Sequence, residues 1–167
     1  MHSATGNIVN VQEGVIAHVV NSWGLFGAGV AGAIRAKWPE AERRYQNWFS
    51  GRNRGISFKL GDVLFVELDQ NTGPTHIAHM LAMNGVRTKT NKTPLDYRSL
   101  GICLDKVYEF CGKMNSTLHI PKIGSGLAGG DWHRISTILE IVQERHPEVL
   151  TTVWELDRRI EDEIVQL

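Results

Sequence analysis

The sequence predicts a three-layer α/β domain in which a mostly parallel or mixed sheet lies between helices. Apolar segments of strand length alternate with amphipathic helical segments, which is the pattern of that architecture. The nearly continuous apolar run from Val15 to Val20 is typical of a central strand covered on both faces. Two glycine-rich segments, residues 27–32 and 124–130, each connect a predicted strand to a predicted helix. Ligands of such sheets bind at the carboxyl ends of strands, where both glycine segments lie.

Length and charge limit the possible functions. The chain has 167 residues, enough for one domain with its own core. We expect residues 1–157 to form that domain and residues 158–167 to be a charged tail. The 18 Lys and Arg residues balance the 18 Asp and Glu residues, and this zero net charge does not favour a dedicated nucleic-acid binder. A local basic group at Arg87, Lys89 and Lys92 is more simply interpreted as a solvated loop.

The two cysteines bear on the cellular compartment. Cys103 and Cys111 lie in one predicted helix, about 12 Å apart. A disulfide tolerates a Cα separation of no more than about 7 Å, so both thiols are expected to be free. Free thiols, no signal peptide and no apolar run long enough to span a membrane predict a cytoplasmic protein. The neutral charge and the lack of heptads predict a monomer.

Local signals place the elements of the first half of the chain. A helix is expected to end before Pro39, because the residue preceding a proline disfavours helical geometry. The segment Asn71–Pro74 is a turn signal between two apolar runs and predicts a hairpin. The predicted elements are strands at 3–9, 15–20, 62–68 and 76–83 and helices at 30–37 and 40–49.

The second half begins with a polar segment. Residues 84–94 are rich in Lys, Thr and Asn, the composition of a mobile surface loop. The following segment carries apolar residues at helical spacing, among them Leu100 and Leu104. The remaining predicted elements are helices at 95–113 and 131–145, strands at 117–120 and 149–156, and a tail at 157–167 that could extend as a short helix.

The glycine segments suggest phosphate binding. A strand, a glycine loop and a helix together present backbone N–H groups and a positive helix end to an anion. Glycine is needed because a Cβ would hold phosphate oxygens away and because some positions require a positive φ. One such segment is equally well explained as a tight connection, but two suggest a diphosphate held from both sides. The Gly-x-Gly-x-x-Gly spacing occurs at Gly27, Gly29 and Gly32 and again at Gly124, Gly126 and Gly129.

A nicotinamide dehydrogenase is not favoured. A dinucleotide fold carries an acidic residue about 20 positions after its first glycine loop, to bind ribose hydroxyls. Arg52 occupies that position here, in a polar connection. The second glycine segment lies too near the C-terminus for a complete mononucleotide-binding half to follow it.

Four segments resemble the macrodomain family, an ADP-ribose-binding α/β fold with a six-stranded mixed sheet between helices. They occur in the family's order across nearly the whole chain. The chain is most similar to the branch of the ADP-ribose 1″-phosphate phosphatase and the terminal ADP-ribose glutamate hydrolase, and bacterial and phage relatives share its second glycine loop. A phage-encoded member would act in the host cytoplasm. The segments are Gly6–Ile8, His18–Asn21, Gly27–Ile34 and Ile120–Trp132.

The resemblance implies roles for individual residues. Asn7 and Ile8 would lie near adenine, and Asn21 would contact the distal ribose. Independently of the resemblance, Arg87 is a candidate to join the loop N–H groups as a phosphate donor. The residues implied to wrap the diphosphate and distal ribose are Gly27, Ala28, Gly29, Val30, Ile123, Gly124, Ser125, Gly126, Leu127 and Ala128.

The sequence also departs from its relatives. Asn7 stands where most macrodomains have aspartate, although its amide oxygen can still accept from the adenine amino group. Ala31 replaces the catalytic aspartate of another large branch. The glutamate hydrolase has a lysine where this chain has Met83–Asn84, and an aspartate partner where it has Ala128. A lysine-adduct mechanism is therefore not favoured.

The favoured function is hydrolysis of a distal-ribose substituent, most concretely dephosphorylation of ADP-ribose 1″-phosphate. That reaction needs phosphoryl donors, a positioned nucleophile or water, and a proton for the leaving oxygen. The catalytic candidates are His18, Asn21, Ser125 and Asp131. Alternatively, His18 is a satisfied core residue, Ser125 only donates a hydrogen bond and Asp131 only caps a helix.

Two other functions remain open. One is removal of ADP-ribose from protein or nucleic acid, and the other is a non-catalytic module that binds an ADP-ribose derivative. No cofactor or metal is implied in either case, because the ADP-ribose moiety is itself the ligand or substrate. The histidines that could suggest a metal site match no ligand motif and are interpreted as packing residues: His76, His79 and His119.

Overall fold

The computed structural model describes residues 1–122 and 129–156. In these residues, a six-stranded sheet has the order β1-β6-β5-β2-β4-β3. Neighbouring strands are parallel except β3, which runs antiparallel to β4, so the sheet is mixed as predicted. The strands are β1 (His2–Thr5), β2 (Val15–Asn21), β3 (Val63–Glu67), β4 (His76–Met83), β5 (Leu118–Pro121) and β6 (Thr151–Glu155).

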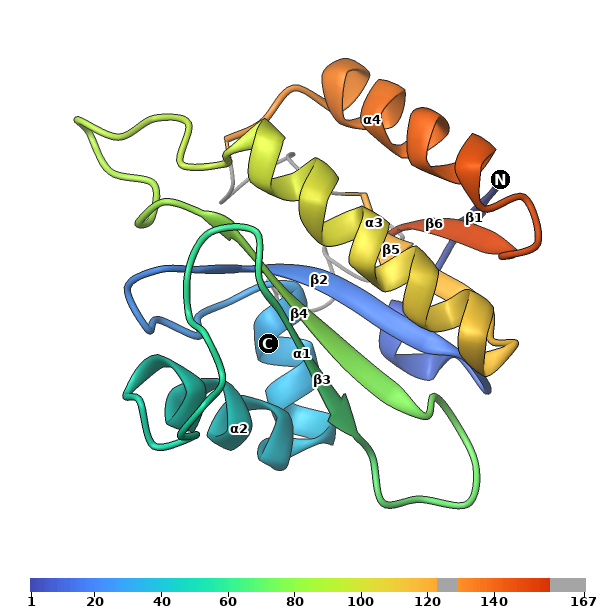
Figure 1. Cartoon of the computed structure of the whole chain (residues 1–167), viewed down its shortest axis with the longest axis horizontal. Helices are drawn as coiled ribbons and strands as arrows, with labels where there is room; N and C mark the ends of the chain where they lie inside the picture. The colour runs from blue at the N-terminus through green and yellow to red at the C-terminus, as the bar shows by residue number, and fades with distance from the viewer. Residues whose placement is uncertain (123–128, 157–167) are drawn as a thin grey trace, which may run out of the picture.

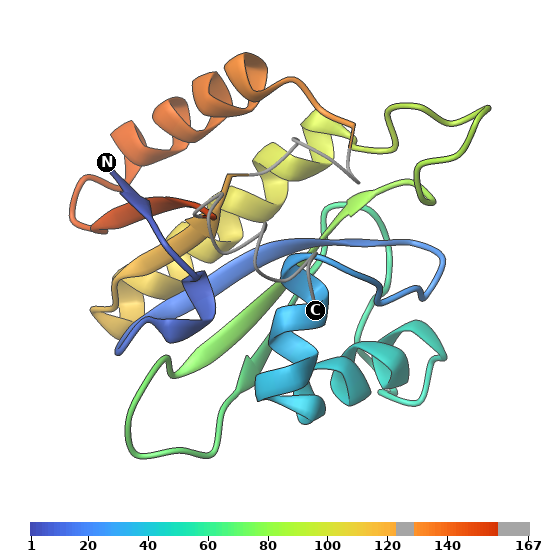
Figure 2. The same cartoon turned by 180° about the vertical axis from the view of Figure 1, so that it is seen from behind.

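Helices cover both faces of the sheet, which confirms the predicted three layers (Figures 1 and 2). Side chains alternate along the strands, so that Ile16 packs in the core toward one pair of helices and Ala17 in the core toward the other. Pro39 is the first residue of the second helix, at the helix boundary predicted there. The helices are α1 (Val30–Lys37) and α2 (Pro39–Phe49) with the 3₁₀ turn η1 (Ile8–Asn10) on one side, and α3 (Tyr97–Met114) and α4 (Trp132–Arg145) on the other.

The predicted ends of two strands were wrong. The first strand stops at Thr5 rather than residue 9, because the Asn7 side chain accepts a hydrogen bond from the Val9 N–H (3.2 Å) and caps η1. The last strand begins at Thr151 rather than residue 149, because the Val149 N–H bonds the His146 carbonyl in the preceding turn. The predicted tail, residues 158–167, lies outside the described residues.

The polar segment 84–94 is a surface loop, as predicted, with a defined hydrogen-bonded shape. The Asn84 N–H donates to the Pro94 carbonyl (2.9 Å) and closes the loop at its base. The Asn91 side chain crosses the loop and donates to the carbonyls of Asn84 (3.0 Å) and Val86 (3.1 Å). The Asn91 side chain therefore supplies hydrogen bonds to loop carbonyls that are not paired in a β-ladder.

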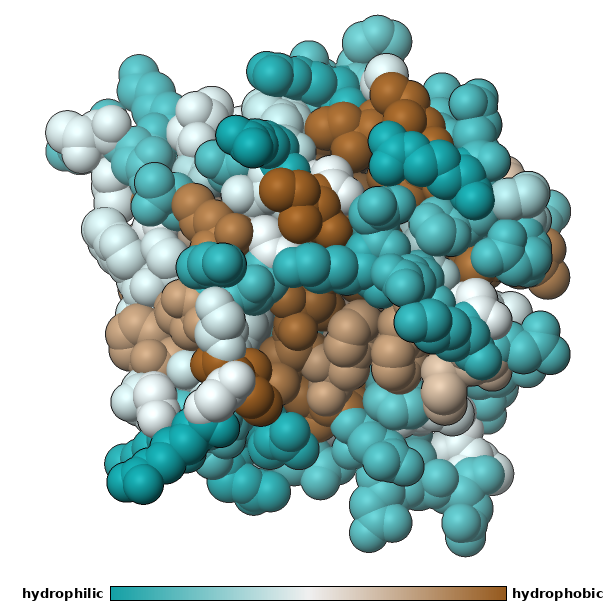
Figure 3. Space-filling model, in the orientation of Figure 1, coloured by the Kyte–Doolittle hydropathy of each residue, from teal (hydrophilic) through white to brown (hydrophobic). Residues whose placement is uncertain are grey.

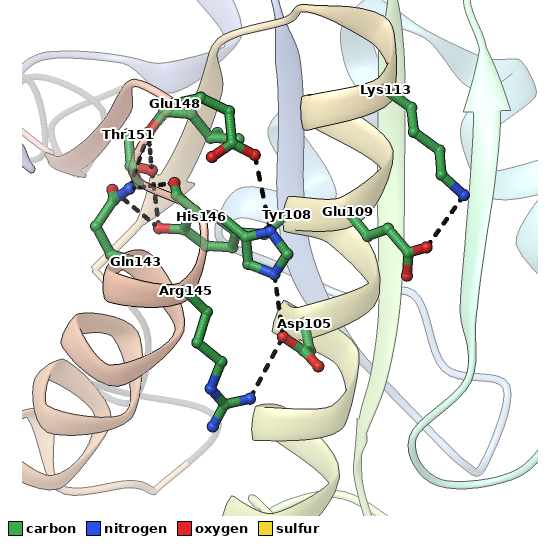
Figure 4. Close-up of polar contacts among 10 residues, drawn as sticks. Asp105, Tyr108, Glu109, Lys113, Gln143, Arg145, His146, Glu148 and Thr151 are labelled. Carbon is green, nitrogen blue, oxygen red and sulfur yellow. Dashed lines mark hydrogen bonds and ion pairs between the residues drawn. The ribbon is translucent and has the colours of Figure 1, made fainter.

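A polar network joins α3 to α4 and to the start of β6 (Figure 4). The Thr151 hydroxyl donates to the Tyr108 hydroxyl (2.8 Å), and the Gln143 amide donates to the Val149 carbonyl (3.0 Å). Asp105 lies 3.2 Å from His146 and 3.5 Å from Arg145. Because Thr151 is the first residue of β6, this network lies at the amino-terminal edge of the sheet, away from the strand ends expected to bind ligand.

The cysteines, the helices and the surface are those of an ordinary globular domain. Cys103 and Cys111 are free and buried, and burial raises the pKa of each thiol to about 12. Within the described part of the chain, no helix is long and apolar enough to cross a bilayer. Apolar side chains gather in the middle of one face and are surrounded by hydrophilic ones (Figure 3).

Gly14 ties together the starts of three strands. Its carbonyl accepts from the Thr75 N–H (2.8 Å) just before β4, and the Val15 N–H donates to the Thr117 carbonyl (2.9 Å) just before β5. Gly14 has φ +88°, and a Cβ here would lie 2.7 Å from the Thr117 carbonyl oxygen. A larger residue would therefore press directly on the backbone of β5.

We predict that Gly14→Ala destabilises the fold more than Gly51→Ala does. Both glycines have a positive φ, but at Gly51 no described heavy atom lies within 4 Å of the Cβ position. Both variants carry the backbone penalty of about 1–2 kcal/mol, and Gly14→Ala adds overpacking of about 1–3 kcal/mol. Urea unfolding measures the difference, and equal losses would contradict the steric role of Gly14.

Candidate functional site

The candidate site is built from the segments that follow the carboxyl ends of the parallel strands. Residues 22–29 follow β2, residues 84–95 follow β4, and residues 129–131 precede α4 after β5. The first two segments are joined, because the Gly85 N–H donates to the Ser22 hydroxyl (2.8 Å). The second and third are in contact, because a Cβ at Gly129 would lie 3.2 Å from the Thr93 Cα. Three loops therefore lie in a row along this edge.

Asn21, the last residue of β2, organises the first loop. Its side-chain oxygen accepts from the N–H groups of Trp23 (3.0 Å) and Leu25 (3.1 Å), and its amide nitrogen donates to the Leu25 carbonyl (2.6 Å). The buried Tyr45 hydroxyl donates to the Asn21 carbonyl (2.6 Å). A primary amide has two N–H hydrogens, and among the described residues only one of them has an acceptor, so the other can donate to a ligand. The predicted contact with a distal ribose rests on that hydrogen.

The first glycine segment is open toward solvent. Gly27, Ala28 and Gly29 are exposed, and no described heavy atom lies within 4 Å of a Cβ position at Gly27 or Gly29. Gly29 has φ +69° and precedes α1 without giving it a side-chain cap. The first N–H groups of α1, from Val30 onward, therefore lack a side-chain acceptor at the cap. This arrangement suits an anion.

The core of the second glycine segment, residues Ile123, Gly124, Ser125, Gly126, Leu127 and Ala128, lies outside the described residues. Its two flanks are described. The Lys122 N–H donates to the Trp154 carbonyl (2.8 Å), which continues the sheet. Gly129 has φ +66° and lies against the backbone of Lys92, so only glycine fits there. Arg87, the predicted phosphate donor, is an exposed residue of the same 84–94 loop.

Asp131 is the N-cap of α4. Its carboxylate accepts from the His133 N–H (3.0 Å), and its own N–H donates to the Tyr97 hydroxyl (2.8 Å). This geometry favours the capping role that the sequence already allowed. In the described residues, only one oxygen of the exposed carboxylate takes part in these bonds, so the other remains able to accept from water.

Asn7 and Ile8, predicted to lie near adenine, form the turn after β1. The Asn7 amide oxygen caps η1, and Ile8 is buried against the core on the α1 side. An amide oxygen has two lone pairs, so one remains for an adenine amino group. The adenine contact stays a prediction.

His18 lies in the core between the sheet and α2, with a side chain that is 2% exposed. Its Nε2 is 2.7 Å from His79 Nδ1, and His79 Nε2 is 2.9 Å from the Ala41 carbonyl. Because a carbonyl only accepts, His79 carries its proton on Nε2, and His18 Nε2 donates to His79 Nδ1. Phe26 packs edge-on against His18, with ring centroids 5.8 Å apart. This burial favours the core role over direct contact with substrate.

In the described residues, the other histidines do not form a metal-binding cluster. His119 accepts from the Trp154 indole N–H (3.0 Å) through Nδ1, and His76 lies beside the Thr75 hydroxyl (2.9 Å). Among the described residues, no group of three His, Cys, Asp or Glu side chains could hold a metal ion.

Two supporting residues were not foreseen. Nothing in the sequence signals the hydrogen bond from the Tyr45 hydroxyl to the Asn21 carbonyl. Arg35, on α1, donates to the carbonyls of Phe26 and Gly27 and so reaches the first glycine segment. A basic side chain two turns after a glycine loop could have indicated this contact, because that spacing brings it back over the loop.

We predict that the His18–His79 pair destabilises the fold as the pH falls. Burial, and for His18 also the neighbouring His79, lowers both pKa values from the ordinary 6.5, to about 4 for His79. Between these values the unfolded chain binds protons that the native pair does not. The contribution of the pair to the free energy of unfolding is therefore fully present above pH 6.5. Below pH 6.5 it declines by about 1.4 kcal/mol per pH unit for each histidine.

Urea unfolding between pH 7 and pH 4, together with imidazole NMR titration, measures this effect. The variant His2→Gln is the matched control, because His2 is exposed and its loss should leave the decline unchanged. Folded-state titration of His18 and His79 near the ordinary value would contradict the prediction.

The comparisons with known proteins fit this geometry. A family model described as Macro domain matches residues 17–139. The ADP-ribose 1″-phosphate phosphatase of Candida albicans is 24% identical over 145 residues, covering 79% of this chain and 83% of that protein. The DNA ADP-ribosyl glycohydrolase of Mycobacterium tuberculosis is 22% identical over 150 residues, covering 90% of this chain and 40% of that protein.

The fold comparison agrees. A crystal structure of a Bacteroides thetaiotaomicron protein superposes with a TM-score of 0.78 and 26% identity, covering 92% of this chain and 98% of that one. The family match spans well over half of the sequence and includes β2, α1 and the loops between them. The chain therefore belongs to the macrodomain family.

Proposed function

We propose that this macrodomain binds an ADP-ribose derivative along the carboxyl ends of β2 and β5 and hydrolyses a substituent on the distal ribose. The favoured substrate is ADP-ribose 1″-phosphate. The observation that carries the proposal is the exposed segment Gly27–Gly29, which stands between Asn21 and the uncapped start of α1. The similarity to the Candida albicans phosphatase supports the choice of substrate.

The geometry suits a diphosphate with a ribose beside it. Backbone N–H groups at the start of α1 and the positive end of its dipole attract the anion. Asn21 precedes this segment by six residues in the chain, and its second amide hydrogen suits a ribose hydroxyl. The Asn21 amide is thus proposed to face the ribose hydroxyls, and the N–H groups at the start of α1 are proposed to face the diphosphate.

Hydrolysis of the 1″-phosphate adds water to phosphorus and releases the ribose oxygen with a proton. Arg87 and the loop N–H groups are proposed to donate to the phosphoryl oxygens. Asp131 is proposed to take a proton from the attacking water through the carboxylate oxygen that does not cap α4 and to return it to the departing ribose oxygen, with Ser125 as a hydrogen-bond donor. His18 is proposed to support the Asn21 loop from below rather than to touch the substrate, because it is buried beneath Phe26.

We predict that the wild-type protein releases phosphate from ADP-ribose 1″-phosphate and that Asp131→Asn lowers this release while leaving binding of ADP-ribose intact. Asparagine caps helices about as well as aspartate does, so the substitution removes the carboxylate but not the cap. The loss is expected at about 10²–10⁴-fold for a group that handles a proton. Phosphate release and calorimetric titration with ADP-ribose measure the two effects.

Glu109→Gln, an exposed acid of α3 paired with Lys113, is the matched control. Unchanged release in Asp131→Asn would reduce Asp131 to a helix cap. An intact substrate alongside tight ADP-ribose binding by the wild type would overturn the phosphatase proposal and leave a non-catalytic binding module.

A second candidate is removal of ADP-ribose from single-stranded nucleic acid, which a basic and aromatic surface favours. Trp23 is 54% exposed, and its indole lies against Gly85 of the neighbouring loop. The Phe49 ring, itself exposed, lies against Gly24. Residues 43–61 carry no acidic residue and five basic ones, Arg43, Arg44, Arg52, Arg54 and Lys59.

Four of these five basic residues are exposed, and Arg44 is half-buried. None of the five takes part in an ion pair within residues 1–122 and 129–156. Basic side chains with interleaved aromatic rings are typical of surfaces that bind single strands. The chain as a whole is neutral, so this local excess of positive charge is offset elsewhere. The Mycobacterium tuberculosis glycohydrolase gives this candidate its second support.

We predict that Trp23→Ala weakens binding of a fluorescent single-stranded oligonucleotide about fivefold or more, because base stacking on an aromatic ring contributes about 1–3 kcal/mol. Arg52→Gln and Arg54→Gln should each reduce the salt dependence of binding by about 0.7 in the logarithmic slope. Anisotropy titrations at several salt concentrations measure both. Lys113→Gln, on α3, is the control, and no binding by the wild type would exclude this candidate.

A further inference from the structure

Arg35 holds the first glycine segment from behind. Its guanidinium donates to the Phe26 carbonyl through Nη1 and to the Gly27 carbonyl through Nη2 (3.2 Å). The two bonds join consecutive peptide groups to one rigid, planar side chain. Arg35 therefore sets the orientation of two peptides in the loop that the proposed ligand would meet.

The orientation of these carbonyls determines where the N–H groups point. In a planar trans peptide, the carbonyl and the following N–H point in opposite directions. The peptide of the Phe26 carbonyl carries the Gly27 N–H, and that of the Gly27 carbonyl carries the Ala28 N–H. With both carbonyls turned toward Arg35, both N–H groups turn away from it. Neither N–H donates to another backbone group within the described chain.

Two neighbours fit this arrangement. A Cβ at Gly32 would lie 3.3 Å from the Gly27 carbonyl oxygen and 3.7 Å from Arg35 Nη2, so glycine leaves room for the hydrogen bond between them. The Glu42 carboxylate lies 3.7 Å from Arg35 Nε and holds the guanidinium from its other side. Gly32, the third glycine of the Gly-x-Gly-x-x-Gly spacing, thus leaves room for the Arg35 side chain rather than for the ligand.

We infer that Arg35 is a positioning residue for a diphosphate: by holding the carbonyls of Phe26 and Gly27, it turns the N–H groups of Gly27 and Ala28 toward the phosphate oxygens. The inference rests on the proposed function, since a diphosphate is the ligand in both. It adds that the loop is oriented before the ligand arrives. A preorganised loop loses less conformational entropy on binding.

The competing explanation is simple attraction between the charge of Arg35 and the phosphates. The variant Arg35→Lys separates the two. Lysine keeps the positive charge but offers a single flexible ammonium, which cannot hold two carbonyls in one plane. Positioning predicts that Arg35→Lys behaves like Arg35→Gln, whereas attraction predicts that it behaves like the wild type.

Calorimetric titration with ADP-ribose tests this difference. Both Arg35→Lys and Arg35→Gln are expected to bind about ten- to a hundredfold more weakly, the loss typical of hydrogen bonds to charged groups. Arg145→Gln, which removes an exposed arginine paired with Asp105 on α3, is the matched control and should bind like the wild type. Wild-type affinity in Arg35→Lys would overturn the inference.

A second readout does not depend on ADP-ribose. Amide resonances of Gly27 and Ala28 are followed by NMR during titration with inorganic pyrophosphate. In the wild type both should shift on saturation, and in Arg35→Lys they should not, while the circular dichroism spectrum shows that the variant is folded. Equal shifts in both proteins would also overturn the inference.

The two proposals fail in different ways. If the wild type does not bind ADP-ribose but pyrophosphate still shifts Gly27 and Ala28 in an Arg35-dependent manner, the proposed function fails and the positioning role of Arg35 stands. If ADP-ribose binds equally well to the wild type and both Arg35 variants, the proposed function stands and the positioning role fails.

Discussion

The hydrogen bonds around the Asn21 side chain are the constraint on which the candidate site depends. They end β2, fold the next four residues into a tight loop and place the first glycine segment at the start of α1. Tyr45 fixes the backbone of the same residue from α2. A strand in a parallel sheet has no hairpin to terminate it, so a side chain must do so. Here the terminating side chain also retains a donor for ligand.

Behind the first loop, the support is a buried pair of uncharged histidines. His18 and His79 hold each other as uncharged rings beneath Phe26, and burial keeps their pKa values low. At the first glycine segment, the described charged support is the pair of Arg35 and Glu42 at the protein surface. A core without charge does not compete for the phosphate, so the field at the loop comes from the helix end and from the surface side chains.

The layers and the order of the elements could be predicted from sequence because they follow from periodicity, which is local. The run Val15–Val20 has the length and the β-branched composition of a buried central strand. The early end of β1 could not be predicted, because a side chain–backbone bond at Asn7 outweighs the strand propensity of its neighbours. For the site, glycine spacing indicated the loops and could have indicated Arg35, but the hydrogen bond from Tyr45 to Asn21 joins residues far apart in the chain and has no signal in the sequence. The Asp131 cap was foreseen as an alternative because capping is local.

The three loops at the carboxyl edge are interlocked in series: Ser22 holds Gly85, and the backbone at Lys92 and Thr93 encloses Gly129. None of them can change shape without disturbing its neighbour. A ligand fragment that holds one preformed loop in its bound shape also stabilises the loop in contact with it, which is a coupling free energy between subsites. The adenosine and ribose-phosphate halves of an elongated ligand should then bind more tightly joined, or both present, than the sum of their separate affinities implies. For the proposed ligand, this edge would act as one coupled receptor rather than as a series of independent pockets.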